Sequence, residues 1–89
     1  MLPEEALRAK TQRSLVDLLH TELDLGETFA QSALQAKSGG HMEHHVQAKQ
    51  RALKAADAVR HFMAQVADDV VRTEIDRKLA ELDWLISTL

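Results

Sequence analysis

Cysteine and tyrosine are absent from this chain of 89 residues, and proline, glycine and aromatic side chains are scarce. Without a thiol, the chain has neither a disulfide framework nor a thiolate metal site. Its aromatic residues are Phe29, Phe62 and Trp84, while thirteen leucines and thirteen alanines supply most of the apolar surface. Such side chains suit helices that approach one another closely. The composition therefore favours a small all-α domain.

The chain also lacks a long apolar run and an excess of positive charge. Its longest uncharged, mostly apolar stretch falls far short of the roughly 20 residues that span a bilayer, and Glu4 and Glu5 stand where a secretory signal would be basic. We therefore expect a cytoplasmic protein without a membrane partner. The formal net charge of −3 argues against nucleic-acid binding. The locally basic residues 47–54 include no aromatic residue for base stacking, so we interpret them as a solvated helix face.

Two adjacent glycines, Gly39 and Gly40, are the strongest structure-breaking signal inside the chain. Glycine adopts positive φ at little steric cost, so this pair can end one helix and turn the chain back on itself. Pro3 suits the first position of a helix, and Asp68 and Asp69 can cap another. Combined with the spacing of apolar residues, these signals predict helices over residues 3–37, 42–66 and 69–88.

Short connections between these helices favour an up-down-up antiparallel three-helix bundle, a single domain over residues 1–89. The first helix is the longest and should overhang its neighbours, and the periodicity leaves open a kink near Gly26. The second helix carries two apolar stripes and should therefore lie between two neighbours. The expected core residues are Leu7, Leu15, Leu18, Leu19, Phe29, Ala30, Ala33 and Ala36; Ala48, Ala52, Ala55, Ala56, Val59, Phe62, Met63 and Val66, with Val46, Leu53 and Ala64 as the second stripe; and Val71, Ile75, Leu79, Leu82, Ile86 and Leu89.

Three histidines, His41, His44 and His45, cluster at the start of the second predicted helix. Rings three or four residues apart on a helix project from one face and can share a metal ion. Glu43 points away from His41, and the sequence identifies no distant carboxylate that would complete the coordination. We therefore favour an exposed polar helix start, with metal binding by the three histidines as the alternative function.

Glu22 interrupts the apolar stripe of the first predicted helix. A buried carboxylate needs a cation or a hydrogen-bond donor, and Arg51, at the edge of the facing stripe, is the best candidate. We therefore expect a buried Glu22–Arg51 pair that sets the register of the two helices. The other interpretation, a general acid or base, lacks a second carboxylate or a nucleophile nearby. No cofactor-binding motif occurs in the chain, so we expect no catalytic activity and no cofactor.

Trp84 lies opposite the apolar stripe of the third predicted helix, alongside Arg77 and Ala80. Tryptophan and arginine are enriched at the centres of protein interfaces. Two interpretations stay open: Trp84 packs over the edge of its own bundle, or it contacts another molecule. Because so small a core gains stability from oligomerisation, we expect an interaction or structural module that self-associates as a dimer through these three residues.

One stretch, Leu25-Gly26-Glu27-Thr28-Phe29, resembles the Leu-Gly-x-x-aromatic signature in the first helix of a tetratricopeptide repeat. Residues 40–43 and 51–53 resemble the turn and the end of the second helix of that repeat. The resemblance implies a helical hairpin with small residues in its interface. The chain departs from the repeat at His45 and Lys49, where a small residue and an aromatic residue are usual, and it has one hairpin instead of three.

A second resemblance is carried by residues 21–29 and 54–62. These segments are similar to a group of small, uncharacterised bacterial helical proteins. The similarity implies a bacterial protein with a helical-hairpin fold, and it implies nothing about chemistry.

Overall fold

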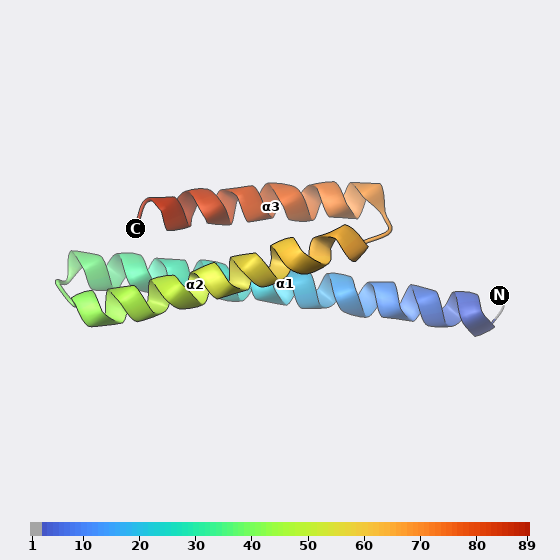
Figure 1. Cartoon of the computed structure of the whole chain (residues 1–89), viewed down its shortest axis with the longest axis horizontal. Helices are drawn as coiled ribbons and strands as arrows, with labels where there is room; N and C mark the ends of the chain where they lie inside the picture. Colours follow the sequence, from blue (N-terminus) through green and yellow to red (C-terminus); the bar gives the residue numbers. More distant parts are fainter. Residues whose placement is uncertain (1–2) are drawn as a thin grey trace.

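Three α-helices account for most of the chain in a computed structural model that describes residues 3–89. The helices are α1 (Pro3–Ser38), α2 (Met42–Phe62) and α3 (Asp69–Ser87), and a short 3₁₀ helix, η1 (Met63–Gln65), follows α2. They run up, down and up along one long axis (Figure 1). Residues 3–89 contain no strand. The predicted all-α three-helix bundle is confirmed, and α1 continues through Gly26 without interruption.

The turn between α1 and α2 is built on Gly40, which has a φ of 77°. Two backbone hydrogen bonds close the end of α1: the N–H of Gly40 donates to the carbonyl of Lys37 at 3.2 Å, and the N–H of His41 donates to that of Ala36 at 2.8 Å. This pattern satisfies carbonyls that would otherwise lack a partner at the end of a helix. A side chain at position 40 would strain the backbone, so the glycine acts as the sequence predicts.

The connection from α2 to α3 differs from the prediction, because α2 ends at Phe62 rather than near residue 66. After η1, the backbone of Val66 becomes extended and its side chain is buried in the core. Asp68 then caps the N-terminus of α3 as predicted, since its carboxylate accepts hydrogen bonds from the N–H groups of Val70 (2.9 Å) and Val71 (3.1 Å).

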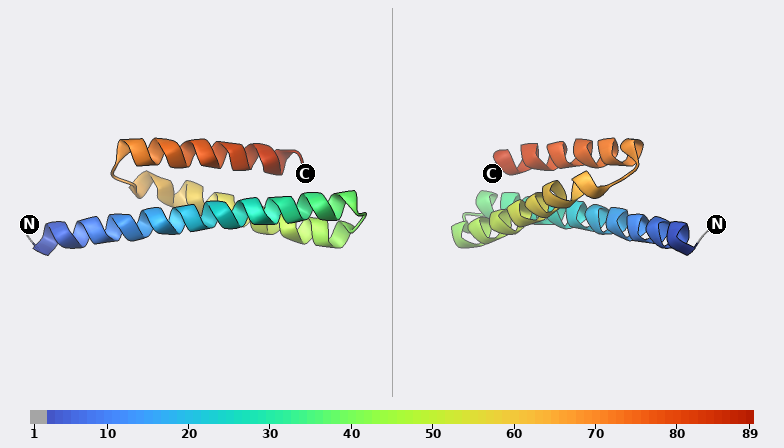
Figure 2. Two further views of the ribbon diagram at one scale, coloured as in Figure 1. Left: turned by 180° about the vertical axis from the view of Figure 1, so that it is seen from behind. Right: turned by 45° about the vertical axis from the view of Figure 1, so that its right-hand side comes forward.

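The first turns of α1 project beyond α2 and α3, as predicted (Figure 2). We call this projecting end, residues 3–13, the overhang. Leu7, expected in the core, is 65% exposed there because neither neighbouring helix reaches it. Contact with the rest of the bundle begins at Gln12, whose side-chain amide donates to the carbonyl of Gln65 at 3.0 Å and accepts from the N–H of Ala67 at 2.9 Å.

The core follows the line along which the three helices meet. Its buried members are Leu19, Leu23, Ala30, Ala52, Ala56, Val59, Val66, Ile75, Leu79, Leu82 and Ile86. Most of them were predicted, and the buried face of α3 matches its predicted stripe. All buried side-chain nitrogen and oxygen atoms within the described residues have hydrogen-bond partners. The packing therefore leaves no orphaned polar group there.

The second apolar stripe predicted for α2 is wrong. Val46, Leu53 and Ala64 are exposed, because α3 lies over the seam between α1 and α2 instead of covering the far side of α2. Leu18 and Phe62 were also expected in the core and are exposed.

A surface ion pair joins α2 to α3: Nη1 of Arg60 lies 2.9 Å from Oδ2 of Asp83, and this hydrogen bond raises the pKa of the guanidinium above its usual range.

Gly26 lies where Leu82 of α3 packs against α1. It is buried, and a Cβ atom at this position would lie 2.6 Å from Cδ2 of Leu82 and 3.3 Å from Cβ of Ala55. The missing side chain thus leaves a notch that Leu82 fills. This close approach, rather than backbone freedom, explains the glycine in the middle of a long helix.

Replacing Gly26 by alanine should therefore lower the free energy of unfolding by about 1 kcal/mol, because forced repacking around Leu82 outweighs the gain in helix propensity. In a Leu82→Ala background the clash with Cδ2 of Leu82 is gone and only the 3.3 Å contact with Ala55 is left, so the same change should be less destabilising there than in the wild type. Urea denaturation of the four proteins measures both effects. An equal effect of Gly26→Ala in the two backgrounds would contradict the notch.

Candidate interaction site

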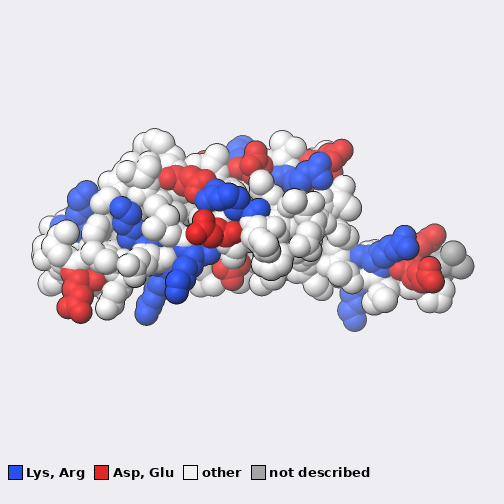
Figure 3. All heavy atoms as spheres, in the orientation of Figure 1, with Lys and Arg blue, Asp and Glu red and all other residues white. Residues whose placement is uncertain are grey.

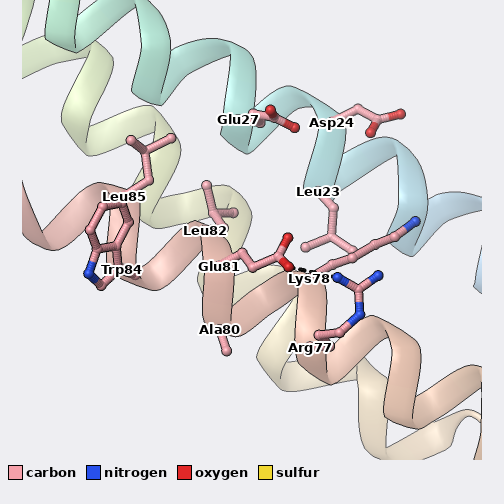
Figure 4. A pocket seen from close by; sticks show the side chains of 10 residues that line it. All are labelled: Leu23, Asp24, Glu27, Arg77, Lys78, Ala80, Glu81, Leu82, Trp84 and Leu85. Atoms are coloured by element: carbon pink, nitrogen blue, oxygen red, sulfur yellow. Dashed lines mark hydrogen bonds and ion pairs between the residues drawn. The ribbon is translucent and has the colours of Figure 1, made fainter.

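An open groove of about 760 Å³ lies between α1 and α3 (Figure 4). Residues of both helices line it: Leu23, Asp24 and Glu27 from α1, and Arg77, Lys78, Ala80, Glu81, Leu82, Trp84 and Leu85 from α3. Leu23 and Leu82 also belong to the core, so the groove is apolar where it meets the bundle. Charged side chains occupy its edges, and the arrangement is that of a binding surface with an apolar centre and a polar rim.

Trp84 stands at one end of the groove, and 69% of its surface is exposed. The buried side chains Ile75, Leu79, Leu82 and Ile86 hold the opposite side of α3 against the bundle. Within its own chain, Trp84 is therefore not packed over the edge of the bundle. An indole exposed to this extent beside an apolar groove is a feature of interaction surfaces.

Arg77 and Ala80, the predicted neighbours of Trp84, are both exposed and line the same groove. Nη1 of Arg77 lies 2.6 Å from Oε1 of Glu81, one helical turn further along. On the facing wall, neither Asp24 nor Glu27 forms an ion pair within residues 3–89. The α1 wall therefore offers two carboxylates to a ligand.

The predicted buried pair of Glu22 and Arg51 is wrong. Glu22 is half-buried and Arg51 is exposed, and no ion pair or hydrogen bond joins them. The guanidinium carbon of Arg51 instead lies 5.7 Å from the ring centroid of Phe29, within cation–π range. Because alanines fill the seam between α1 and α2, the two charged side chains stay at its edge.

The three histidines do not converge as the alternative interpretation, a shared metal ion, would require, and the favoured interpretation, an exposed polar helix start, is wrong for His45. His45 is buried, and its Nδ1 lies 2.8 Å from the carbonyl oxygen of Ala33, whereas Nε2 of the exposed His44 lies 3.1 Å from Oγ of Ser32. His41 precedes the helix with φ −87° and ψ 73°, so helical spacing does not apply to it. Residues 3–89 contain no group of three or more side chains of metal-ligating type that could hold an ion.

Arg77, Ala80 and Trp84 of the α3 wall were predicted from the sequence, whereas the α1 wall was not. Leu23 follows Leu19 by four residues, a spacing that places it on the buried face, and Asp24 and Glu27 flank that face. This spacing could have identified Leu23 as a core residue, but it does not mark Asp24 and Glu27 as one wall of a groove. The opening between the walls depends on how α3 crosses α1, which periodicity does not encode.

No model of a known protein family matches the chain, and comparisons with curated proteins and with solved structures gave no match. The resemblance to a tetratricopeptide hairpin and the similarity to bacterial helical proteins therefore stay predictions. Within residues 3–89, no helix combines the length and the apolar character that crossing a membrane requires.

The placement of the histidines predicts different roles for His45 and His41. His45→Ala should lower the free energy of unfolding by about 1–3 kcal/mol, because a buried side chain and its hydrogen bond are lost. The exposed His41→Ala should change it by less than about 0.5 kcal/mol. Urea denaturation tests this difference. Saturable zinc binding by the wild type in isothermal titration, abolished by either substitution, would contradict this assignment and restore the metal site.

Proposed function

We propose that the protein is a small, non-catalytic helical interaction module that self-associates as a dimer, with Trp84 at the centre of the contact. The observation that supports this most strongly is the exposure of Trp84 at the end of an open groove. Tryptophan contributes a large contact area with little loss of side-chain entropy, and it is enriched among the residues that dominate binding energy.

The surroundings of Trp84 also support a protein partner. Ala80 and Leu85 extend the apolar surface next to the indole, and the Arg77–Glu81 pair supplies a polar rim. Val70, on the first turn of α3, is another large apolar side chain that is mostly exposed. A partner covering this side of α3 would remove from water the apolar area that the bundle itself leaves uncovered.

The small size of the core supports self-association in particular. Chains of this length gain little more than marginal stability from a single core, and a second copy is a common source of additional burial. A closed two-fold dimer is the simplest symmetric assembly. The proposal includes a bacterial, cytoplasmic setting without a nucleic-acid or membrane partner, which rests on the sequence alone.

The test is sedimentation equilibrium of the wild type and of Trp84→Ala at roughly 10–50 μM, a range suited to weak specific dimers. The substitution should weaken association at least about tenfold, as expected for a residue at the centre of an interface. Helix content in circular dichroism should not change, because the indole contributes little to the intrachain core. Trp84 is the single tryptophan, so its emission should also shift to the blue as the wild type associates.

Met42→Ala is the matched control, since Met42 is a large exposed apolar residue outside the groove. This variant should associate as the wild type does. A wild type that stays monomeric throughout the range would overturn the proposal, and equal weakening by both substitutions would show that Trp84 has no special part in the contact.

A further inference from the structure

The charge around Trp84 restricts which surface of a second copy can lie against it. On α3, the acidic side chains of Glu74, Glu81 and Asp83 are each in an ion pair, with Lys78, Arg77 and Arg60 respectively. The α1 wall adds Asp24 and Glu27, neither of which is neutralised by an ion pair within residues 3–89. Two copies that met groove to groove would bring these two carboxylates against their counterparts in the second copy, which opposes association. The groove therefore favours a basic segment with apolar side chains.

The part of the overhang that follows its acidic first turn, Glu4 and Glu5, has this composition. Residues 6–13 include Arg8, Lys10 and Arg13 and no acidic residue. None of the three forms an ion pair within the described chain. Lysine and arginine side chains are visible on the projecting end, between the acidic residues of its first turn and the body of the bundle (Figure 3). Leu7 adds an apolar side chain that nothing in its own chain covers.

From this match we propose that the groove of one copy binds the overhang of a second copy. The inference rests on the proposed self-association around Trp84 and identifies the segment that Trp84 contacts. The basic side chains of the overhang face Asp24 and Glu27, while Leu7 provides apolar contact for Trp84 and Leu85. Each chain carries one groove and one overhang, so two copies satisfy both surfaces by mutual exchange.

The lengths of the two surfaces are compatible. At 1.5 Å per residue, the eleven residues of the overhang extend about 16 Å, and the stretch of α3 from Arg77 to Leu85 extends about 12 Å. The overhang is already helical and therefore needs no ordering when it docks. Its fit depends on ion pairs at the protein surface, so rising ionic strength should weaken the dimer.

Charge reversal tests the proposal on full-length protein. Arg8→Glu combined with Lys10→Glu reverses the overhang, and Asp24→Lys combined with Glu27→Lys reverses the α1 wall. Either double variant alone should dimerise at least about tenfold more weakly than the wild type, because each of its contacts brings like charges together. An equimolar mixture should regain dimerisation, since a mixed dimer pairs reversed with reversed and native with native. Sedimentation equilibrium measures all three samples.

Arg51→Glu combined with Lys54→Glu is the control for net charge, because both residues are exposed on α2 and lie outside the groove. This variant should dimerise as the wild type does. If association of the wild type depends on Trp84 but not on the charges of the overhang or of the α1 wall, this inference is overturned and the proposed function stays intact. An equimolar mixture that does not regain dimerisation would have the same meaning. A monomeric wild type would overturn the proposed function itself.

Discussion

Alanine side chains line both sides of the seam between α1 and α2, and the arrangement of the bundle depends on their small size. Ala30, Ala33 and Ala36 face Ala48, Ala52, Ala55 and Ala56 along this seam. Short side chains let two helices approach closely, but each of them removes little apolar area from water. Larger side chains from α3, namely Ile75, Leu79, Leu82 and Ile86, pack over this seam together with Leu19, Leu23 and Val59 of the hairpin. The close approach of the hairpin helices therefore provides the shape of the fold, and larger side chains from all three helices provide much of its hydrophobic stabilisation.

The packing of α3 over this seam explains why α3 is exposed on its other side. Its four large apolar residues are all needed against the hairpin, and Leu82 reaches down to Gly26. A helix held so tightly along one face presents its opposite face to solvent, and Trp84 lies on that face. The groove results from the same geometry, because α3 lies over the seam and leaves the flank of α1 uncovered beside it.

The helices could be predicted from the sequence because local chemistry defines them: a glycine with positive φ, a capping aspartate and apolar residues at helical spacing. The burial of individual residues could not be predicted in this way, since it depends on how far a neighbouring helix extends along the face. Leu7 and Leu18 fit the periodicity of α1 and yet are exposed. A buried Glu22–Arg51 pair was predicted for the same reason, because helical periodicity assumes that every position on an apolar face is buried. His41 was misplaced because it precedes the helix whose spacing was applied to it.

The candidate site could be predicted in part. Trp84 falls outside the apolar stripe of its helix, and this departure from periodicity is visible in the sequence alone. The facing wall required the three-dimensional structure, because Asp24 and Glu27 are ordinary surface residues until α3 lies beside them. The unpaired charges of the overhang likewise have no sequence signature that separates them from other solvated lysines and arginines.

The hydrogen bonds of Gln12 restrict where residues can be inserted into or deleted from this chain. The hairpin turn fixes one end of α2 against α1, and the paired hydrogen bonds of Gln12 to the backbone of Gln65 and Ala67 fix the other. Between these two points the helices run side by side, so a residue inserted into one alone would rotate every position beyond it by about 100°. An insertion or deletion in α1 must therefore be matched by a compensating change in α2. The residues of the overhang before Gln12 lie outside this interval, so the packing of α1 against α2 does not constrain their number.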